Sequence, residues 1–200
     1  MLKVLRKGLL PKKGRCKIKM ICFRFKWMIK LFVFLGNPGK EYTRTRHNAG
    51  FLLADELYRN ARWSSKFHSL YAEENGRRLL KPMTYMNLSG TAVSECASFF
   101  KLSSEEVMVI HDDLELPLGE VRLQKGGGLQ GHNGLRSIKE RIGSDQFFRL
   151  RLGIGRPRHG DVRNHVTSPF SKDEEITLMQ VFTIAERMLR TPEKEDVGRI

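Results

Sequence analysis

Polar side chains that can transfer protons or hydrogen-bond to carbonyl oxygens occur in three short segments, each of which follows a predicted strand. They are Asn37, Tyr42 and His47 in the first segment, Tyr85 and Asn87 in the second, and His111, Asp112 and Asp113 in the third. In α/β proteins, polar loops at the carboxyl ends of strands are the usual place for catalytic and binding side chains. The three segments therefore predict one site at one edge of a sheet.

His47 and Asp112 have the side-chain types of a base and of the carboxylate that supports it. An imidazole with a pKa of about 6.5 takes a proton from water at neutral pH, and it does so better when a carboxylate holds its other ring nitrogen. The polar segments contain no cysteine and the chain has no G-x-S-x-G motif, so direct attack by water is the simpler chemistry. The alternative is that His47 caps the following helix and Asp112 merely ends a strand.

Three asparagines, Asn37, Asn87 and Asn133, lie in separate loops or beside glycines. A neutral amide can donate to a developing oxyanion or bind a peptide backbone without adding charge. Asparagine is also common in turns and helix caps, and this alternative stays open for each residue taken alone. Their occurrence in three different loops favours a binding role.

The glycine-rich segment 126–131 matches the dinucleotide fingerprint G-x-G-x-x-G through Gly126, Gly128 and Gly131. A dinucleotide site also needs an apolar strand before the loop and an acid about 20 residues later. The preceding strand is polar at alternate positions, and the residues near position 150 are basic. We therefore predict no nucleotide cofactor and interpret the segment as a flexible lid beside the site.

The sequence gives no strong indication of a metal site. The possible ligands are His111, Asp112, Asp113 and His132. They have no diagnostic spacing, so no metal is predicted. The cysteines are Cys16, Cys22 and Cys96, a sparse and odd set that is typical of a cytosolic protein with reduced thiols.

Hydrophobic patterning predicts helices and strands in alternation. Strands are expected at 31–35, 107–110, 120–125 and 148–154, with a hairpin over 63–81 that turns at 74–76. Helices are expected at 48–59, 89–101, 133–142 and 171–189. Asn48 is the expected cap of the first helix, and Ser171 with Glu174 forms a capping box for the last.

This order of elements predicts the α/β class. Strands that alternate with helices form a single three-layer domain, a twisted sheet flanked by helices. The hairpin makes the sheet mixed, with mostly parallel strands. No linker divides the chain, so the domain is expected to span residues 28–200.

The first 27 residues form a basic leader. The chain carries a net charge of +14, and ten Lys and Arg but no acid fall in residues 1–27, so subtracting them leaves +4 for the domain. We favour a disordered segment or an over-extended start, because Met28 immediately precedes the first strand. The alternatives are a basic arm for RNA and a targeting peptide for organelle import. No apolar run approaches the roughly 20 residues of a membrane span.

Four segments together resemble the bacterial-type peptidyl-tRNA hydrolases. They are LGNPG at 35–39 with Tyr42 and RHNAG at 46–50, KPMTYMNLSG at 81–90, HDDLELP at 111–117, and GGGLQGHNGL at 126–135. They occur in the family's order between residues 28 and 170. Four ordered motifs are far more specific than any one of them.

The resemblance implies a reaction: hydrolysis of the ester bond between a peptide and the 3′ ribose of tRNA, which releases both for reuse in translation. By resemblance, His47 is the general base, Asp112 supports it, and Asn37 senses the blocked amino end of the substrate. The remaining implied contacts are amides from Asn87 and Asn133 to the substrate, and Tyr42, Tyr85 and Arg151 at the tRNA site. The family works as a monomer in the cytoplasm, without metal or cofactor and without a membrane.

The chain departs from the family pattern at two places. Leu129 and Gln130 stand where the glycine loop usually continues with His-Gly, and Gln124 stands near a usual Lys of the phosphate-binding patch. These changes bear on lid motion and tRNA affinity rather than on the chemistry. Two other functions stay open: an RNA-binding relative that has lost hydrolysis, and a hydrolase of short N-acyl esters that does not depend on tRNA.

Overall fold

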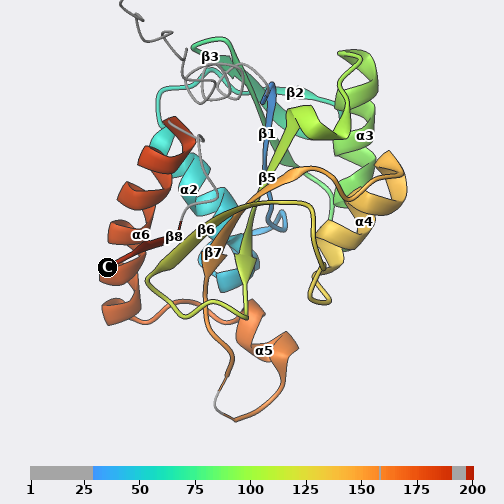
Figure 1. Ribbon diagram of the computed structural model, residues 1–200. Coiled ribbons are helices and arrows are strands. Elements are labelled where there is room, and N and C mark those ends of the chain that lie inside the picture. The colour runs from blue at the N-terminus through green and yellow to red at the C-terminus, as the bar shows by residue number, and fades with distance from the viewer. Residues whose placement is uncertain (1–28, 158, 191–196) are drawn as a thin grey trace, which may run out of the picture.

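The computed structural model describes residues 29–157, 159–190 and 197–200. These residues form one mixed sheet with helices on both faces, which confirms the predicted three-layer α/β domain (Figure 1). The predicted leader, residues 1–27, lies outside the described residues. Among the helices that are described, none combines the length and the apolar character that crossing a membrane requires.

The sheet contains eight strands within the described residues. They are β1 Leu31–Phe34, β2 Ser64–Lys66, β3 Ser69–Glu74, β4 Arg77–Pro82, β5 Val107–Asp113, β6 Glu120–Lys125, β7 Phe148–Gly153 and β8 Val197–Arg199. Their order across the sheet is β2-β3-β4-β1-β5-β7-β6-β8. The four central strands pair in parallel, and the outer strands pair antiparallel.

Five α-helices and four short 3-10 turns connect the strands in the described part of the chain. The helices are α2 Ala49–Leu57, α3 Ser89–Phe99, α4 Asn133–Ile142, α5 Val162–Thr167 and α6 Lys172–Arg190. The 3-10 turns are η1 Lys40–Tyr42, η2 Arg46–Asn48, η3 Met86–Leu88 and η4 Ser104–Glu106. The helices α2 and α6 cover one face of the sheet, and α3 and α4 cover the other (Figure 1).

The two faces of the central strands supply two separate hydrophobic cores, because successive side chains of a strand point to opposite sides. In β5, Met108 and Ile110 pack toward α2 and α6, whereas Val107 and Val109 pack toward α3 and α4. All four side chains are fully buried. Strand β1 is therefore apolar throughout, and the polar residues of β5 stand at its carboxyl end.

The start of helix α2 lies in space beside the carboxyl end of β1 and packs directly on the strand backbones. A Cβ atom on Gly50 would lie 2.6 Å from the carbonyl oxygen of Leu35 and 2.8 Å from that of Ile110. Only glycine fits this contact, because real Cβ atoms do not approach backbone atoms so closely. The contact brings the chain just before Gly50, including His47, close to the end of β5.

Most predicted elements occur at or within a few residues of their expected positions. The hairpin turn at Asn75 and Gly76 has positive φ at both residues, as a two-residue turn between right-twisted strands requires. The capping box of α6 is also present: the backbone N–H of Ser171 donates to Glu174 Oε2 at 2.7 Å. The short helix α5 and strand β8 were not predicted, because neither has a clear apolar period.

Two local predictions were wrong. The third polar segment is not a loop, because β5 continues through Asp113 and pairs with β7 from Met108 to Asp113. Asn48 precedes α2 but its side chain makes no cap hydrogen bond to that helix. Its amide instead bonds to Asn37, as described below.

Candidate active site

A cavity of about 750 Å³ opens at the carboxyl ends of the central strands. The loops after β1 and β4, the end of β5, the start of α4 and one side of α5 form its walls. Six of the predicted site residues line it, namely Asn37, His47, Tyr85, Asn87, Asp112 and Asn133. Tyr42 and Arg151 do not line the cavity and lie beside it.

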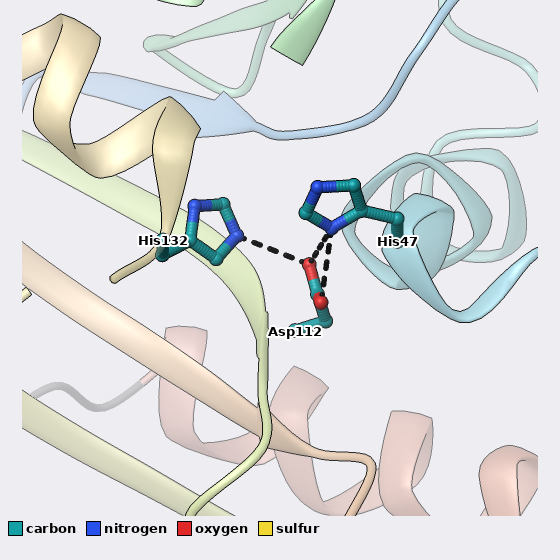
Figure 2. A group of neighbouring side chains, drawn as sticks. All are labelled: His47, Asp112 and His132. Atoms are coloured by element: carbon teal, nitrogen blue, oxygen red, sulfur yellow. Dashed lines mark hydrogen bonds and ion pairs between the residues drawn. The ribbon is translucent and has the colours of Figure 1, made fainter. Parts of the chain in front are cut away.

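His47 and Asp112 are in direct contact (Figure 2). The Nδ1 atom of His47 lies 2.9 Å from Asp112 Oδ1 and 3.0 Å from Oδ2. His47 comes from η2, and Asp112 comes from the end of β5, where its side chain is 2% exposed. A carboxylate at Nδ1 favours the tautomer whose proton is on that nitrogen, so Nε2 is left with a lone pair that can accept a proton.

The pair also changes the acidity of both groups. Burial alone would lower the pKa of His47, but the charge and hydrogen bond of Asp112 outweigh it, so the pKa lies above its usual value. Burial alone would raise the pKa of Asp112, but His47 and His132 hold it far below its usual range. Asp112 is therefore ionised at every pH at which His47 titrates.

His132 is a second histidine on the same carboxylate. Its Nε2 atom lies 3.1 Å from Asp112 Oδ1, and its ring centroid lies 5.1 Å from that of His47 (Figure 2). Its Nδ1 atom accepts the backbone N–H groups of Gly134 at 3.1 Å and Leu135 at 3.3 Å, and so caps the start of α4. Because Nδ1 accepts, the proton of neutral His132 is on Nε2, and His132 is a hydrogen-bond donor to Asp112.

His47, Asp112 and His132 are also the one group of described residues whose arrangement is compatible with a metal ion. Their ligand atoms lie within 4.8 Å of one another. The hydrogen bonds argue against such a site, because a metal on Nε2 of neutral His132 requires the proton on Nδ1, and Nδ1 already accepts two N–H groups. The donor set fits a shared hydrogen-bonded carboxylate better than it fits a metal ion.

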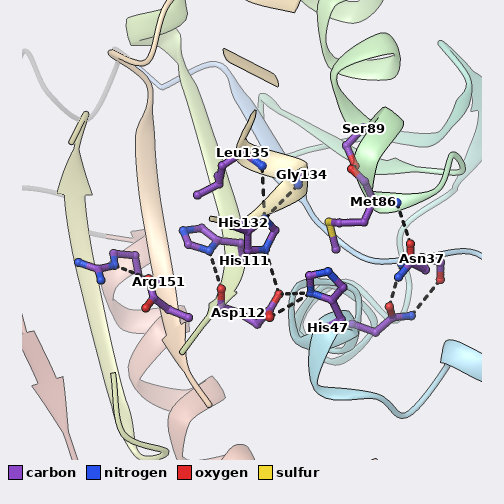
Figure 3. A network of polar contacts seen from close by, with 12 residues as sticks. Asn37, His47, Met86, Ser89, His111, Asp112, His132, Gly134, Leu135 and Arg151 are labelled. Carbon is purple, nitrogen blue, oxygen red and sulfur yellow. Dashed lines mark hydrogen bonds and ion pairs between the residues drawn. The ribbon is translucent and has the colours of Figure 1, made fainter. Parts of the chain in front are cut away.

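Asn37, near the start of the segment that follows β1, is held by three hydrogen bonds (Figure 3). Its backbone N–H donates to Asn48 Oδ1 at 2.8 Å, and its carbonyl accepts from Asn48 Nδ2 at 3.0 Å. Its side-chain Oδ1 accepts the backbone N–H of Met86 at 2.7 Å. With Oδ1 occupied, the Nδ2 amino group is the donor that this cavity-lining side chain has left for a ligand.

Asn87, Asn133 and the two tyrosines form the outer part of the site. Asn87 and Asn133 are exposed and lie on η3 and at the first position of α4. Tyr85 is 56% exposed, and its ring meets that of Tyr42 edge to face with centroids 6.5 Å apart. Aromatic rings beside a cavity offer a surface on which a nucleobase or ribose can pack.

Arg151, which the resemblance assigns to the tRNA site, is buried and paired. Its Nε atom donates to Asp113 Oδ2 at 2.7 Å, and its Nη1 atom donates to Gln124 Oε1 at 2.8 Å. Its side chain is 10% exposed. Asp113 compensates part of its charge, and Gln124 orients it without adding charge.

The glycine-rich segment is attached to the sheet by two side chains. Gln124 Nε2 donates to the carbonyl of Gly126 at 3.0 Å, and Arg149 Nη1 donates to that of Gly128 at 2.8 Å. Arg149 is 2% exposed and was not predicted as part of the site. Arg149 lines the cavity, so a buried cation lies beneath the segment that was predicted to be a lid.

His111 should give the fold a distinct sensitivity to acid. Its Nδ1 atom donates to the carbonyl of Asp112 at 2.7 Å, and burial, with the nearby His132, lowers its pKa to about 3. The unfolded chain protonates this histidine near its usual pKa of about 6.5. Stability attributable to His111 is therefore present above about pH 6.5 and is lost as the pH falls toward 3.

We expect the stability of His111→Asn to fall less steeply with decreasing pH, because an asparagine keeps an N–H donor but does not titrate. Melting temperatures of both proteins between about pH 7 and 5 measure the effect, and the difference between them should shrink as the pH falls. The contribution of His47 has the opposite sign, since its raised pKa adds stability below about pH 6.5. If the difference in melting temperature between the two proteins stays the same from pH 7 to 5, the role of His111 is contradicted.

Comparison with known proteins identifies the family of this chain. The family model described as peptidyl-tRNA hydrolase matches residues 31–199. The chain is 52% identical over 157 residues to the peptidyl-tRNA hydrolase of Geotalea uraniireducens, which covers 75% of this chain and 82% of that one. It is 49% identical over 175 residues to that of Sulfurimonas denitrificans, which covers 84% and 94%.

Solved structures give the same result. The crystal structure of peptidyl-tRNA hydrolase from Acinetobacter baumannii superposes with a TM-score of 0.75 at 38% identity, over 82% of this chain and 89% of that one. A peptidyl-tRNA hydrolase in complex with N-propanol gives the same TM-score and identity, over 81% and 87%. This chain belongs to the peptidyl-tRNA hydrolase family.

Proposed function

We propose that this protein hydrolyses the ester bond between a peptide and the 3′ ribose of tRNA, and that His47 and Asp112 carry the reaction. The contact of 2.9 Å between His47 Nδ1 and Asp112 Oδ1 is the main support, because it leaves Nε2 of His47 free to act as the base. His47 lines a cavity of about 750 Å³ that can hold the substrate end. Membership of the peptidyl-tRNA hydrolase family supplies the substrate.

The reaction proceeds by direct attack of water. His47 Nε2 takes a proton from a water molecule as its oxygen bonds to the ester carbonyl carbon. The tetrahedral intermediate then collapses, the bond to the ribose 3′ oxygen breaks, and the imidazolium returns its proton to that oxygen. Asp112 stabilises the imidazolium through Nδ1 without taking the proton.

The asparagines bind the substrate around this step. Asn37 donates its Nδ2 group to the peptide and so distinguishes a blocked amino end from a free ammonium. Asn87 and Asn133, on the cavity wall, donate to substrate carbonyls, including the oxygen on which negative charge develops. Neutral donors suit this task, because they add no charge to the site.

The tRNA end lies against the aromatic and basic side of the site. Tyr42 and Tyr85 contact the terminal nucleotide, and Arg151 contributes to phosphate binding from beside the cavity. Phosphate contacts and shape, rather than base reading, hold the acceptor strand. The protein acts as a monomer in the cytoplasm, a proposal that sedimentation at working concentration and cell fractionation test.

One assay separates this function from its alternatives. Purified protein is incubated with N-acetyl aminoacyl-tRNA and with the unblocked aminoacyl-tRNA, and release of deacylated tRNA is measured. We expect fast release from the blocked form alone. Binding without release would favour an RNA-binding relative, and equal hydrolysis of short N-acyl esters would favour a hydrolase that does not depend on tRNA.

Arg151→Ala should weaken tRNA binding and reduce its dependence on salt. Removing one cationic partner of a phosphate lowers the slope of log affinity against log salt by about one. Because Asp113 partly neutralises Arg151, the slope should change by less than this full amount. Binding titrations at several salt concentrations measure it.

The control for this measurement is Arg59→Ala, which removes an exposed arginine that pairs with Glu56 on α2. It should leave the slope unchanged. An unchanged slope in Arg151→Ala as well would remove Arg151 from the residues that bind phosphate.

A further inference from the structure

The two residues on either side of His47 are unusual for a surface turn. Arg46 is 8% exposed and Asn48 is 2% exposed, although both are polar and both belong to the turn η2. Buried polar groups destabilise a fold unless they are hydrogen-bonded. The partners of these two side chains therefore show what the turn is attached to.

Asn48 attaches the turn to Asn37. Its side-chain amide bonds to both the N–H and the C=O of Asn37, at 2.8 and 3.0 Å, in a reciprocal pair. This pair fixes the backbone of Asn37, and the bond from Met86 N–H fixes its side chain. Asn48, the residue that follows His47, is therefore held at a set position relative to Asn37.

Arg46 attaches the other side of the turn to the segment before α6. Its Nη2 atom donates to both carboxylate oxygens of Glu174, at 2.8 and 2.7 Å. Its Nη1 atom donates to Ser168 Oγ at 2.7 Å and to the carbonyl of Pro169 at 2.6 Å. The backbones also meet, since Arg46 N–H donates to the carbonyl of Ser168 at 3.1 Å.

Glu174 has a second task, which makes this attachment rigid. Its Oε2 atom accepts the N–H of Ser171 at 2.7 Å, and its own N–H donates to Ser171 Oγ at 3.3 Å. One carboxylate therefore caps a helix of 19 residues and binds the residue before His47. Because Nη1 of Arg46 binds Ser168 and Pro169 while Nη2 binds Glu174, the contacts fix the orientation of the guanidinium as well as its distance.

We infer that Arg46 and Asn48 are positioning residues, which fix His47 relative to Asn37 by attaching η2 to α6 on one side and to Asn37 on the other. The inference rests on the proposed roles of His47 and Asn37. Neither Arg46 nor Asn48 lines the cavity, so each acts through its neighbour His47. A shift of about 1 Å in a catalytic group is enough to cost about 100-fold in rate.

The test for Asn48 is a double-mutant cycle in the blocked aminoacyl-tRNA assay. Asn48→Ala should lower kcat about 10-fold to 100-fold with KM within about threefold of the wild type. Because Asn48 acts through His47, His47→Ala combined with Asn48→Ala should be no slower than His47→Ala alone. Losses that multiply, or a wild-type kcat in Asn48→Ala, would overturn the inference.

A purely structural role would not produce this coupling in kcat. If Asn48→Ala does not fold, Asn48→Asp takes its place in the cycle, since it keeps the size and the acceptor for Asn37 N–H and loses the donor. Melting temperatures are recorded for every variant, and the assays are run well below the lowest of them.

The test for Arg46 changes its partner. Glu174→Gln keeps an oxygen that can cap α6 but removes the charge that binds Arg46, and it should lower kcat several-fold with little change in KM. The matched control is Glu175→Gln, which breaks the exposed pair between Arg44 and Glu175 one residue along. Equal kcat in the two variants would overturn the role of Arg46.

The proposed function and the positioning roles fail in different ways. No hydrolysis by the wild type, or full activity in His47→Ala, would contradict the proposed function. An active wild type and an inactive His47→Ala, together with unchanged kcat in Asn48→Ala and Glu174→Gln, would contradict the positioning roles alone.

Discussion

His47→Ala should lower the turnover of N-blocked aminoacyl-tRNA by a factor on the order of 10²–10⁴ and leave tRNA affinity nearly unchanged. In the proposed mechanism, Nε2 of His47 accepts a proton from water, whereas other side chains bind tRNA. Single-turnover release of tRNA measures the first quantity, and a binding titration with deacylated tRNA measures the second.

A surface histidine provides the control for this result. His68 lies in the turn between β2 and β3 with a φ of +50°, so His68→Asn is a suitable change, because asparagine tolerates that conformation. It should be as active as the wild type. A rate for His47→Ala within about threefold of the wild type would remove His47 as the base, and a large loss of tRNA affinity would assign it to binding.

Asp112→Asn should reduce turnover by a similarly large factor, on the order of 10²–10⁴, through the wrong tautomer of His47. An amide has one acceptor oxygen, but Asp112 accepts from two histidines. His132 is fixed as a donor by its cap on α4, so it takes the amide oxygen at the Oδ1 position. The NH₂ group then faces His47 Nδ1, and the proton of His47 moves to Nε2.

A second change tests this explanation. His132→Ser keeps a good helix cap but no longer reaches Asp112, so the amide of Asp112→Asn can turn its oxygen toward His47. The double variant should therefore recover part of the turnover that Asp112→Asn loses. A double variant as slow as, or slower than, Asp112→Asn would contradict the tautomer explanation.

The pH dependence of kcat/KM is an independent test of the pair formed by His47 and Asp112. Asp112 raises the pKa of His47, and only the neutral imidazole is a base, so the acidic limb of kcat/KM should lie above about pH 6.5 in the wild type. Without the carboxylate, the residual activity of Asp112→Asn should have its limb at lower pH. A shift in the opposite direction would mean that His47 is not the titrating group.

The fold was largely predictable because local patterns and tertiary structure agree. Leu31 to Phe34 form an apolar run and become a buried central strand, and Asn75 with Gly76 supplies the one turn that a tight hairpin needs. Ser171 and Glu174 mark the start of α6. Strand β8 has no such signal, because its place beside β6 is decided by packing at the sheet edge.

The site was predictable only in part, because its contacts join distant segments. The motifs suggested His47 with Asp112, but no spacing indicated that His132 would share the same carboxylate. Its position just before α4 was the available signal, since a polar residue there is a natural cap. Asn48 was wrongly predicted as a helix cap, because its local sequence indicates a cap but the tertiary structure places Asn37 within hydrogen-bonding distance.

The cap on α4 has a spectroscopic consequence. The amide protons of Gly134 and Leu135 point at His132 Nδ1, and the same ring donates through Nε2 to Asp112. A ligand that turns the His132 ring away from Asp112 would also break these two hydrogen bonds. The backbone NMR signals of Gly134 and Leu135 therefore report on the contact between His132 and Asp112, and they can be followed in the unmodified protein while substrate binds.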